Sequence, residues 1–258
     1  MTGLNIYGEN LTNSMILGTA LYPNLDVMRK AIQTSNVDMV TVSLKRELTG
    51  GKNNFFWQHI QQTRCKVLPN TAGCRTADEA RMIAKAAREI FKTDYIKLEV
   101  IGDKHTLQPD VFELLKACEM LIEDGFKVLP YCNDDLIVCQ RLVQLGCRVL
   151  MPLGSYIGSG QGINNPEAFK LLRQRFPDIT LIVDAGIGTP SDATKAMELG
   201  FDGVLLNSAI ALADDPVTMA KAFDLSIKSG KLAYQAKRMP KRAFAQSSTN
   251  LEDTPFWQ

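Results

Sequence analysis

A lysine and a glutamate interrupt an apolar run, Asp94 to Asp103, and are the residues of this chain best placed to do chemistry. The run is rich in residues that favour strands. Strand alternation sends Lys97 and Glu99 to one face and their apolar neighbours to the other. A lysine facing a packed interior loses hydration, which lowers its pKa and provides a nucleophilic amine near neutral pH. We interpret this as imine chemistry; a structural ion pair or a solvated face is the alternative.

Composition excludes several function classes. The chain has 258 residues, of which 45% are hydrophobic and 22% charged, as in ordinary globular proteins. A net charge of +1 gives no electrostatic reason to expect nucleic acid or an acidic membrane as a partner. No apolar run approaches the roughly 18 residues that span a bilayer, and the first residues lack a secretory signal. We therefore expect a cytoplasmic protein.

Cysteine and histidine are arranged unlike a metal site. The six cysteines contain no C-x-x-C pair, so they are expected to be reduced thiols. Neither of the two histidines, His59 and His105, forms a ligand-like cluster with cysteines or carboxylates in the sequence. We expect no metal, no histidine-based triad and no cofactor.

Eight short apolar runs, each followed by a helical pattern, indicate repeated βα units with a parallel sheet. The predicted strands are Ser14 to Thr19, Val37 to Ser43, Lys66 to Asn70, Tyr95 to Val100, Lys127 to Tyr131, Arg148 to Pro152, Thr180 to Asp184 and Gly203 to Leu206. Eight units in this length predict a single (βα)8 TIM barrel over residues 1–258. An open doubly wound sheet is the alternative, because periodicity does not report closure.

Helix boundaries and three extra segments complete the prediction. Helix starts are marked by Thr76, Asn133 and Thr189, and helix ends by the glycines at 125, 146 and 200. Residues 1–13 form an N-terminal extension that is a strand or a lid, and 46–59 form a long second loop. Residues 237–258 are polar, and the part from 241 onward is a flexible tail.

Two segments at the ends of the last strands are typical of a phosphate site. Barrels commonly bind phosphate at the loops after strands seven and eight. Here Ala185 and Gly186 lead to a helix N-terminus, and Asn207 and Ser208 add amides and a hydroxyl. Tight turns are the alternative explanation for these glycines.

Further candidates lie nearby. Asp184 ends an apolar strand and is a candidate acid or base, or a cap for its own loop. The glycine-rich segment Gly154 to Gly162 is either a gating loop or a surface connection. Asn70 could bind a substrate hydroxyl or form a turn, and Phe55 to Trp57 are interpreted as local packing.

Six segments in this order resemble one family, the thiazole synthases of bacterial and plastid thiamin biosynthesis. They are Lys66 to Gly73, Ile96 to Gly102, Val128 to Tyr131, Ile157 to Gly162, Val183 to Gly188 and Asp202 to Ser208. The resemblance covers about Leu17 to Pro240. It implies a (βα)8 barrel that makes thiazole phosphate from 1-deoxy-D-xylulose 5-phosphate, dehydroglycine and sulfur, delivered as the thiocarboxylate of a ubiquitin-like carrier protein.

The resemblance also implies roles for individual residues. Lys97 forms an imine with the sugar ketone, and Glu99 and Asp184 move protons. The sugar phosphate is held at Gly158, Ala185, Gly186, Asn207 and Ser208. Implied partners are the thiocarboxylated carrier and further copies of the chain in a dimer or tetramer. The enzyme that produces dehydroglycine is a further candidate partner.

Two other functions use the same features. An imine-forming aldolase of the deoxyribose-phosphate type would need the same lysine and phosphate loops, but would cleave its substrate without a carrier. A non-catalytic scaffold for the carrier would keep the fold without needing Lys97, Glu99 and Asp184.

Overall fold

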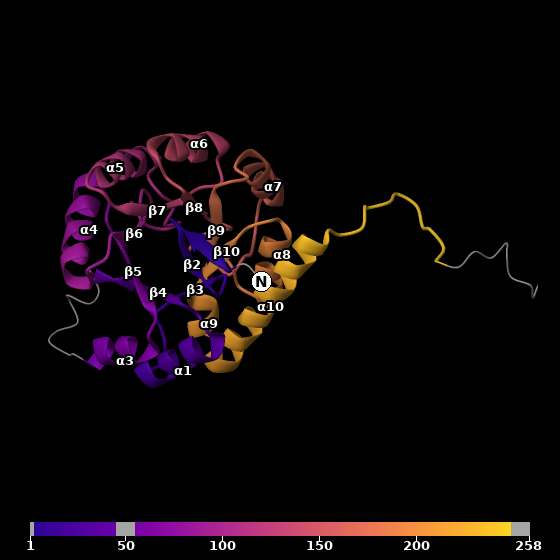
Figure 1. The fold of residues 1–258 in the computed structure, drawn as a ribbon, viewed down its shortest axis with the longest axis horizontal. Coiled ribbons are helices and arrows are strands. Elements are labelled where there is room, and N and C mark those ends of the chain that lie inside the picture. Colours follow the sequence, from indigo (N-terminus) through magenta and orange to yellow (C-terminus); the bar gives the residue numbers. More distant parts are fainter. Residues whose placement is uncertain (1–2, 45–54, 249–258) are drawn as a thin grey trace, which may run out of the picture.

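The strands of the computed structural model, which describes residues 3–44 and 55–248, close into a parallel barrel (Figure 1). The order is β10-β3-β4-β5-β6-β7-β8-β9, and the seam is closed by pairing Val204 with Met15. The predicted (βα)8 barrel is confirmed, and the open sheet is excluded. The strands are β3 (Met15–Gly18), β4 (Met39–Ser43), β5 (Lys66–Asn70), β6 (Tyr95–Leu98), β7 (Lys127–Cys132), β8 (Val149–Pro152), β9 (Thr180–Asp184) and β10 (Gly203–Leu206).

Helices surround the strands and bury faces made largely of small and aliphatic residues (Figure 1). In α4, for example, Ala80, Ala84 and Ala87 are buried, and their spacing places them on one helix face. The described helices are α1 (Leu25–Ser35), α3 (Phe55–Thr63), α4 (Ala77–Phe91), α5 (Val111–Glu123), α6 (Leu136–Leu145), α7 (Pro166–Arg175), α8 (Pro190–Glu198), α9 (Ser208–Ala211) and α10 (Pro216–Ala236). None of these helices is long and apolar enough to cross a membrane.

The helix boundaries follow the expected chemistry, with one correction. Thr76 caps α4 by accepting a hydrogen bond from the Glu79 amide, and Thr189 begins α8 with a full capping box. The predicted start at Asn133 is wrong by two residues. Asp135 caps α6 instead, because its carboxylate accepts hydrogen bonds from two backbone amides of the first turn.

The three predicted helix-ending glycines adopt left-handed backbone angles, with φ of +82° at Gly125, +114° at Gly146 and +92° at Gly200. Left-handed geometry just past a helix end is the form that glycine accommodates best. Each glycine therefore ends its helix a few residues before the next strand begins.

The predicted second loop, 46–59, is wrong over residues 55–59. Residues 55–59 belong to α3, whose aromatic side chains pack locally: the Trp57 ring lies 5.0 Å from the Phe91 ring and 4.9 Å from that of Phe56. This packing stabilises a helix where glycine and asparagine upstream suggest a loop. The part at 46–54 lies outside the described residues.

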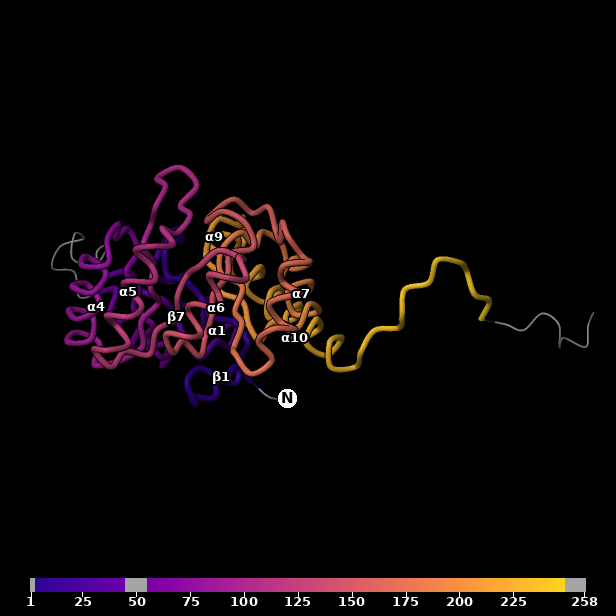
Figure 2. The backbone as a smooth tube through the Cα atoms, turned by 90° about the horizontal axis from the view of Figure 1, so that it is seen from above, coloured from indigo at the N-terminus to yellow at the C-terminus, as the bar shows by residue number. Residues whose placement is uncertain are grey.

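The N-terminal extension closes one end of the barrel. Strands β1 (Leu4–Ile6) and β2 (Glu9–Leu11) pair antiparallel, and Leu4, Ile6 and Leu11 are buried among interior side chains of the barrel. Figure 2 shows this hairpin projecting on the side opposite α9. The extension is therefore a plug at the amino ends of the strands and not a lid over their carboxyl ends.

Residues 237–248 contain neither helix nor strand and are exposed, and they run away from the barrel beyond α10 (Figure 1). The rest of the predicted tail lies outside the described residues.

Candidate active site

Lys97 of β6 and Glu99 just after it share one face, as alternation predicts, and this face is the barrel interior. Each keeps only 6% of its surface exposed. Their apolar neighbours Ile96, Leu98 and Val100 are fully buried in the layer between strands and helices. The strand itself ends at Leu98, so Glu99 lies just beyond it. The alternative of a solvated face is excluded, because both side chains are buried.

A third charged group completes the centre. Asp184, at the end of β9, places Oδ2 2.7 Å from Nζ of Lys97, and Glu99 places Oε1 3.0 Å from the same nitrogen. Asp184 is 3% exposed. Among the described residues, Oδ2 has no other hydrogen-bond partner, so it retains the capacity to accept a proton. One buried lysine thus lies between two buried carboxylates.

The sequence-based expectation of a lowered lysine pKa is wrong. Burial lowers the pKa of Lys97, but the charges of Asp184 and Glu99 and their hydrogen bonds outweigh it, and the pKa is raised above its ordinary value. Lys97 is therefore an ammonium in the resting site. Desolvation raises the pKa of Asp184 to about 6, against the lowering effect of Lys97 and with a further increase from Glu99.

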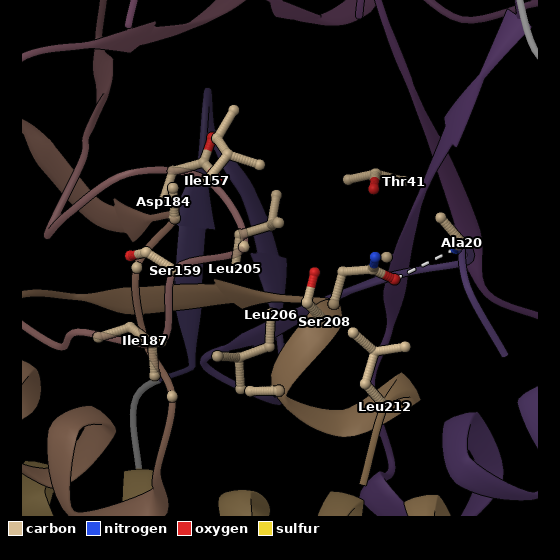
Figure 3. Close-up of a pocket in the computed structure, with 18 of the residues that line it drawn as sticks. Ala20, Thr41, Ile157, Ser159, Asp184, Ile187, Leu205, Leu206, Ser208 and Leu212 are labelled. Atoms are coloured by element: carbon tan, nitrogen blue, oxygen red, sulfur yellow. Dashed lines mark hydrogen bonds between the residues drawn. The ribbon is translucent and has the colours of Figure 1, made fainter. Parts of the chain in front are cut away.

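A cavity of about 580 Å³ opens above these groups at the carboxyl ends of the strands. Figure 3 shows Asp184, Ile157 and Ser159 on one side of it, Thr41 and Ala20 on the other, and Ser208 between them. All eight sequence-predicted site residues line this one cavity: Lys97, Glu99, Asp184, Gly158, Ala185, Gly186, Asn207 and Ser208. Their predicted roles are separate from this placement and stay predictions.

The loops after β8 and β9 are fastened to each other beside the cavity. The Gly162 amide donates to the Gly186 carbonyl over 2.8 Å, and the Gly154 amide donates to the Ala185 carbonyl over 3.3 Å. Ala185 has φ of +70°, which is unusual for a residue other than glycine. A Cβ on Gly186 would collide with Ser155, so glycine is required there. The glycines permit close packing of two loops.

Asn207 already has a partner within the protein. Its Oδ1 accepts a hydrogen bond from the Ala20 amide over 3.1 Å, drawn as the dashed line in Figure 3. A Cβ on Gly18 would meet the Asn207 side chain at 2.6 Å, so the glycine at the end of β3 makes room for it. Asn207 therefore joins the ends of β10 and β3 across the seam of the barrel.

Several lining residues escaped sequence reasoning. Gly18, Ala20, Thr41 and Ser43 come from the ends of β3 and β4 and line the cavity. The rule that barrel sites lie at the carboxyl ends of strands could have found them, since each lies among the last three residues of a predicted strand or directly follows it. Asn70 lines the cavity, as binding of a substrate hydroxyl would require. Its side chain also accepts a hydrogen bond from the Ala72 amide, as a turn-forming residue does.

Tyr131 was also not singled out. It is fully buried at the end of β7, its ring centre lies 5.9 Å from Nζ of Lys97, and its hydroxyl donates to the Leu107 carbonyl over 3.2 Å. Burial raises the pKa of Tyr131, and the nearby Asp184 and Glu99 raise it further. The phenol therefore stays neutral and acts as an apolar wall beside the lysine.

Within the described part of the chain, no group of side chains is suited to hold a metal ion.

Comparison with known proteins agrees with this geometry. The family model described as "Thiazole biosynthesis protein ThiG" matches residues 5–250. The thiazole synthase of Bradyrhizobium sp. (strain ORS 278) is 55% identical over 98% of both chains, and that of Neisseria gonorrhoeae is 51% identical over 98% of both chains. The solved BexX/CysO complex of Amycolatopsis orientalis contains a chain that is 26% identical with a TM-score of 0.84, covering 94% of this chain and 99% of that one. The chain therefore belongs to the thiazole synthase family, the enzymes that make the thiazole of thiamin.

Proposed function

We propose that Lys97 forms an imine with the ketone of 1-deoxy-D-xylulose 5-phosphate and that the chain builds thiazole phosphate on this intermediate. The observation that carries the proposal is the buried lysine held between Asp184 and Glu99 at the base of the cavity. A structural ion pair needs one carboxylate and no cavity. A lysine with two carboxylates beside a space of substrate size is suited to covalent chemistry that requires proton transfer.

The raised pKa keeps Lys97 protonated, so the lysine needs a base before it can act as a nucleophile. The amine attacks a carbonyl only after losing its proton, and Oδ2 of Asp184 is 2.7 Å away to accept it. The raised pKa of Asp184 makes this acceptor more basic than an ordinary carboxylate. Attack then gives a carbinolamine, which loses water to form the protonated imine.

The imine acidifies the adjacent carbon of the sugar. A neighbouring carboxylate removes that proton and returns one further along, which shifts carbonyl character toward C3. The thiocarboxylate sulfur of the carrier attacks the C3 carbonyl, and hydrolysis of the acyl–sulfur bond releases the carrier as its carboxylate and leaves the sulfur on the sugar. Loss of water with condensation of dehydroglycine then closes the ring. Glu99 is the second carboxylate within reach of Lys97, and we assign proton transfer on the sugar to the pair of carboxylates together.

The sugar phosphate is assigned to the two fastened loops and to the end of β10. Gly158, Ala185, Gly186 and Ser208 line this part of the cavity. Their backbone amides and the Ser208 hydroxyl are groups of the kind that bind anions at such loops. Asn207 is assigned a supporting role, because its side-chain oxygen is engaged with Ala20.

The sulfur donor is assigned to a ubiquitin-like carrier protein bearing a C-terminal thiocarboxylate. BexX, a solved relative, was crystallised in complex with a second protein, CysO. A donor of this kind distinguishes the proposal from an aldolase, which needs only the sugar phosphate.

Reconstitution tests this function. The full chain is supplied with 1-deoxy-D-xylulose 5-phosphate, thiocarboxylated carrier and dehydroglycine generated in the reaction mixture. Formation of thiazole phosphate is followed by mass spectrometry. We expect product only when all three are present. Cleavage of the sugar phosphate by the chain alone would support the aldolase instead, and binding of the carrier without turnover would support the scaffold.

A further inference from the structure

Thr71, the first residue after β5, makes an unusual set of hydrogen bonds with the active strand. Its Oγ1 donates to the Glu99 carbonyl over 2.7 Å and accepts from the Glu99 amide over 2.8 Å. Its own amide donates to the Lys97 carbonyl over 3.1 Å. Thr71 has no exposed surface. One side chain thus bonds both backbone polar groups of a proposed catalytic carboxylate.

This arrangement replaces strand pairing that is absent at this point. Strands β5 and β6 share a single paired position, Asn70 with Lys97, and β6 ends at Leu98. The backbone groups of Glu99 therefore lie beyond the ladder, where buried amides and carbonyls still need partners. The Thr71 hydroxyl supplies both, as the backbone of a longer neighbouring strand would.

Thr71 is itself firmly placed. Its carbonyl accepts a hydrogen bond from the Cys74 amide over 3.1 Å, and the Ile101 amide donates to the Cys74 carbonyl over 2.8 Å. The turn after β5 and the segment after β6 are therefore joined on both sides of Glu99. Loss of the Thr71 hydroxyl would remove both hydrogen bonds to the Glu99 backbone while the flanking backbone hydrogen bonds remain.

We propose that Thr71 is a positioning residue that sets the Glu99 carboxylate against Lys97. By fixing the Glu99 backbone at two points, the hydroxyl fixes the direction in which its side chain leaves the chain. Oε1 then lies 3.0 Å from Nζ of Lys97. Thr71 acts through Glu99 and does not touch substrate. The inference rests on the proposed function, in which Glu99 moves protons.

Two substitutions separate the hydroxyl from the bulk of the side chain. Thr71→Val keeps the shape and removes the hydroxyl, and Thr71→Ser keeps the hydroxyl. In the full chain in heavy water, the rate at which deuterium replaces the C3 proton of 1-deoxy-D-xylulose 5-phosphate is measured against substrate concentration, because this exchange reports the proton transfer on the sugar that is assigned to Glu99 and Asp184. We expect Thr71→Ser to stay within about threefold of the natural chain and Thr71→Val to be slower by about tenfold or more, part of the ~10²–10⁴-fold that positioned acid–base groups contribute. The half-saturating concentration should change by less than about twofold, because the phosphate loops are untouched.

A double-mutant cycle shows whether Thr71 acts through Glu99. In a Glu99→Gln background, Thr71→Val should slow the C3 exchange by less than about twofold, because the carboxylate it positions is already gone. A merely structural role would give the same tenfold loss in both backgrounds. Thr71→Ala, which puts no methyl group against the Glu99 peptide, provides the same comparison if the valine variant fails to fold.

The outcomes separate the two proposals. No adduct on Lys97 in the natural chain would refute the proposed function, whatever Thr71 does. An adduct in the natural chain, with an unchanged rate of C3 exchange in Thr71→Val or an equal loss of that rate in the Glu99→Gln background, would overturn the role of Thr71 and leave the proposed function standing.

Discussion

Nζ of Lys97 lies 2.7 Å from Oδ2 of Asp184, an ion pair that crosses the barrel interior from β6 to β9. The two strands are not neighbours in the sheet, so the contact exists only because the barrel is closed. Since Glu99 lies 3.0 Å from the same nitrogen, the buried centre holds two carboxylates and one ammonium. A proton leaving the lysine therefore has an acceptor already in contact, and the amine can be generated without a base from solvent.

The first prediction concerns pH. Asp184 accepts the lysine proton only when ionised, and its pKa is raised to about 6. Below that value the carboxyl group is protonated, so the rate of imine formation should fall about tenfold per unit as pH drops well below about 6. The check is the rate of adduct trapping in the natural chain from about pH 5 to about pH 8. In Asp184→Asn this acidic limb should vanish along with most of the rate; an unchanged limb would assign it to another group.

The second prediction concerns the lysine. Replacing both carboxylates, by Glu99→Gln and Asp184→Asn together, leaves desolvation as the dominant influence, so the pKa of Lys97 should fall below its ordinary value. Acylation of Lys97 by acetic anhydride at neutral pH, followed by peptide mass spectrometry, should then become faster relative to exposed Lys104 in the same sample. Equal relative rates in the natural and substituted chains would contradict the account of the site's electrostatics.

The third prediction uses two glycines with the same backbone angle. Gly186 and Gly125 both have φ of +82°, but only at Gly186 would a Cβ collide with a neighbour, Ser155. Gly125→Ala should lower the free energy of unfolding by about 1–2 kcal/mol through backbone strain, and Gly186→Ala should lower it further because its Cβ also collides with Ser155. Gly186→Ala should in addition raise the half-saturating sugar phosphate concentration by about tenfold or more, because the two fastened loops must separate. A similar increase in Gly125→Ala would show that strain alone is responsible.

The fourth prediction concerns Ala185, which adopts φ of +70° directly after Asp184. Glycine has no steric penalty at this angle, so Ala185→Gly should raise the free energy of unfolding by up to about 1 kcal/mol. Denaturant unfolding followed by circular dichroism measures the change. A loss of stability would mean that the Ala185 methyl group contributes packing that outweighs the backbone strain.

Much of the fold was predictable because the signals are local. Predicted runs at Lys66 to Asn70, Thr180 to Asp184 and Gly203 to Leu206 coincide with observed strands, since Gly, Pro and polar residues mark their ends. Alternation alone predicted that Lys97 and Glu99 share a face, but it did not show that this face is the barrel interior. The start of α6 was misplaced because three consecutive polar residues, Asn133 to Asp135, could each cap a helix.

The electrostatics of the site were not predictable in the same way. The sign of the Lys97 pKa shift depends on Asp184, which is distant in sequence and reaches the lysine only through barrel closure. Glu99 alone suggested an ion pair, and burial alone suggested a lowered pKa. Thr71 was equally hidden, because its hydroxyl matters only where β6 ends one residue before Glu99.

Covalent trapping at Lys97 tests the central claim most directly. The full chain is incubated with 1-deoxy-D-xylulose 5-phosphate and borohydride, digested, and mapped by mass spectrometry, beside a Lys97→Ala variant whose cooperative unfolding is checked. We predict one reduced sugar adduct, on the peptide that contains Lys97, and none in the folded variant. No adduct, or an adduct on another lysine, would contradict the account.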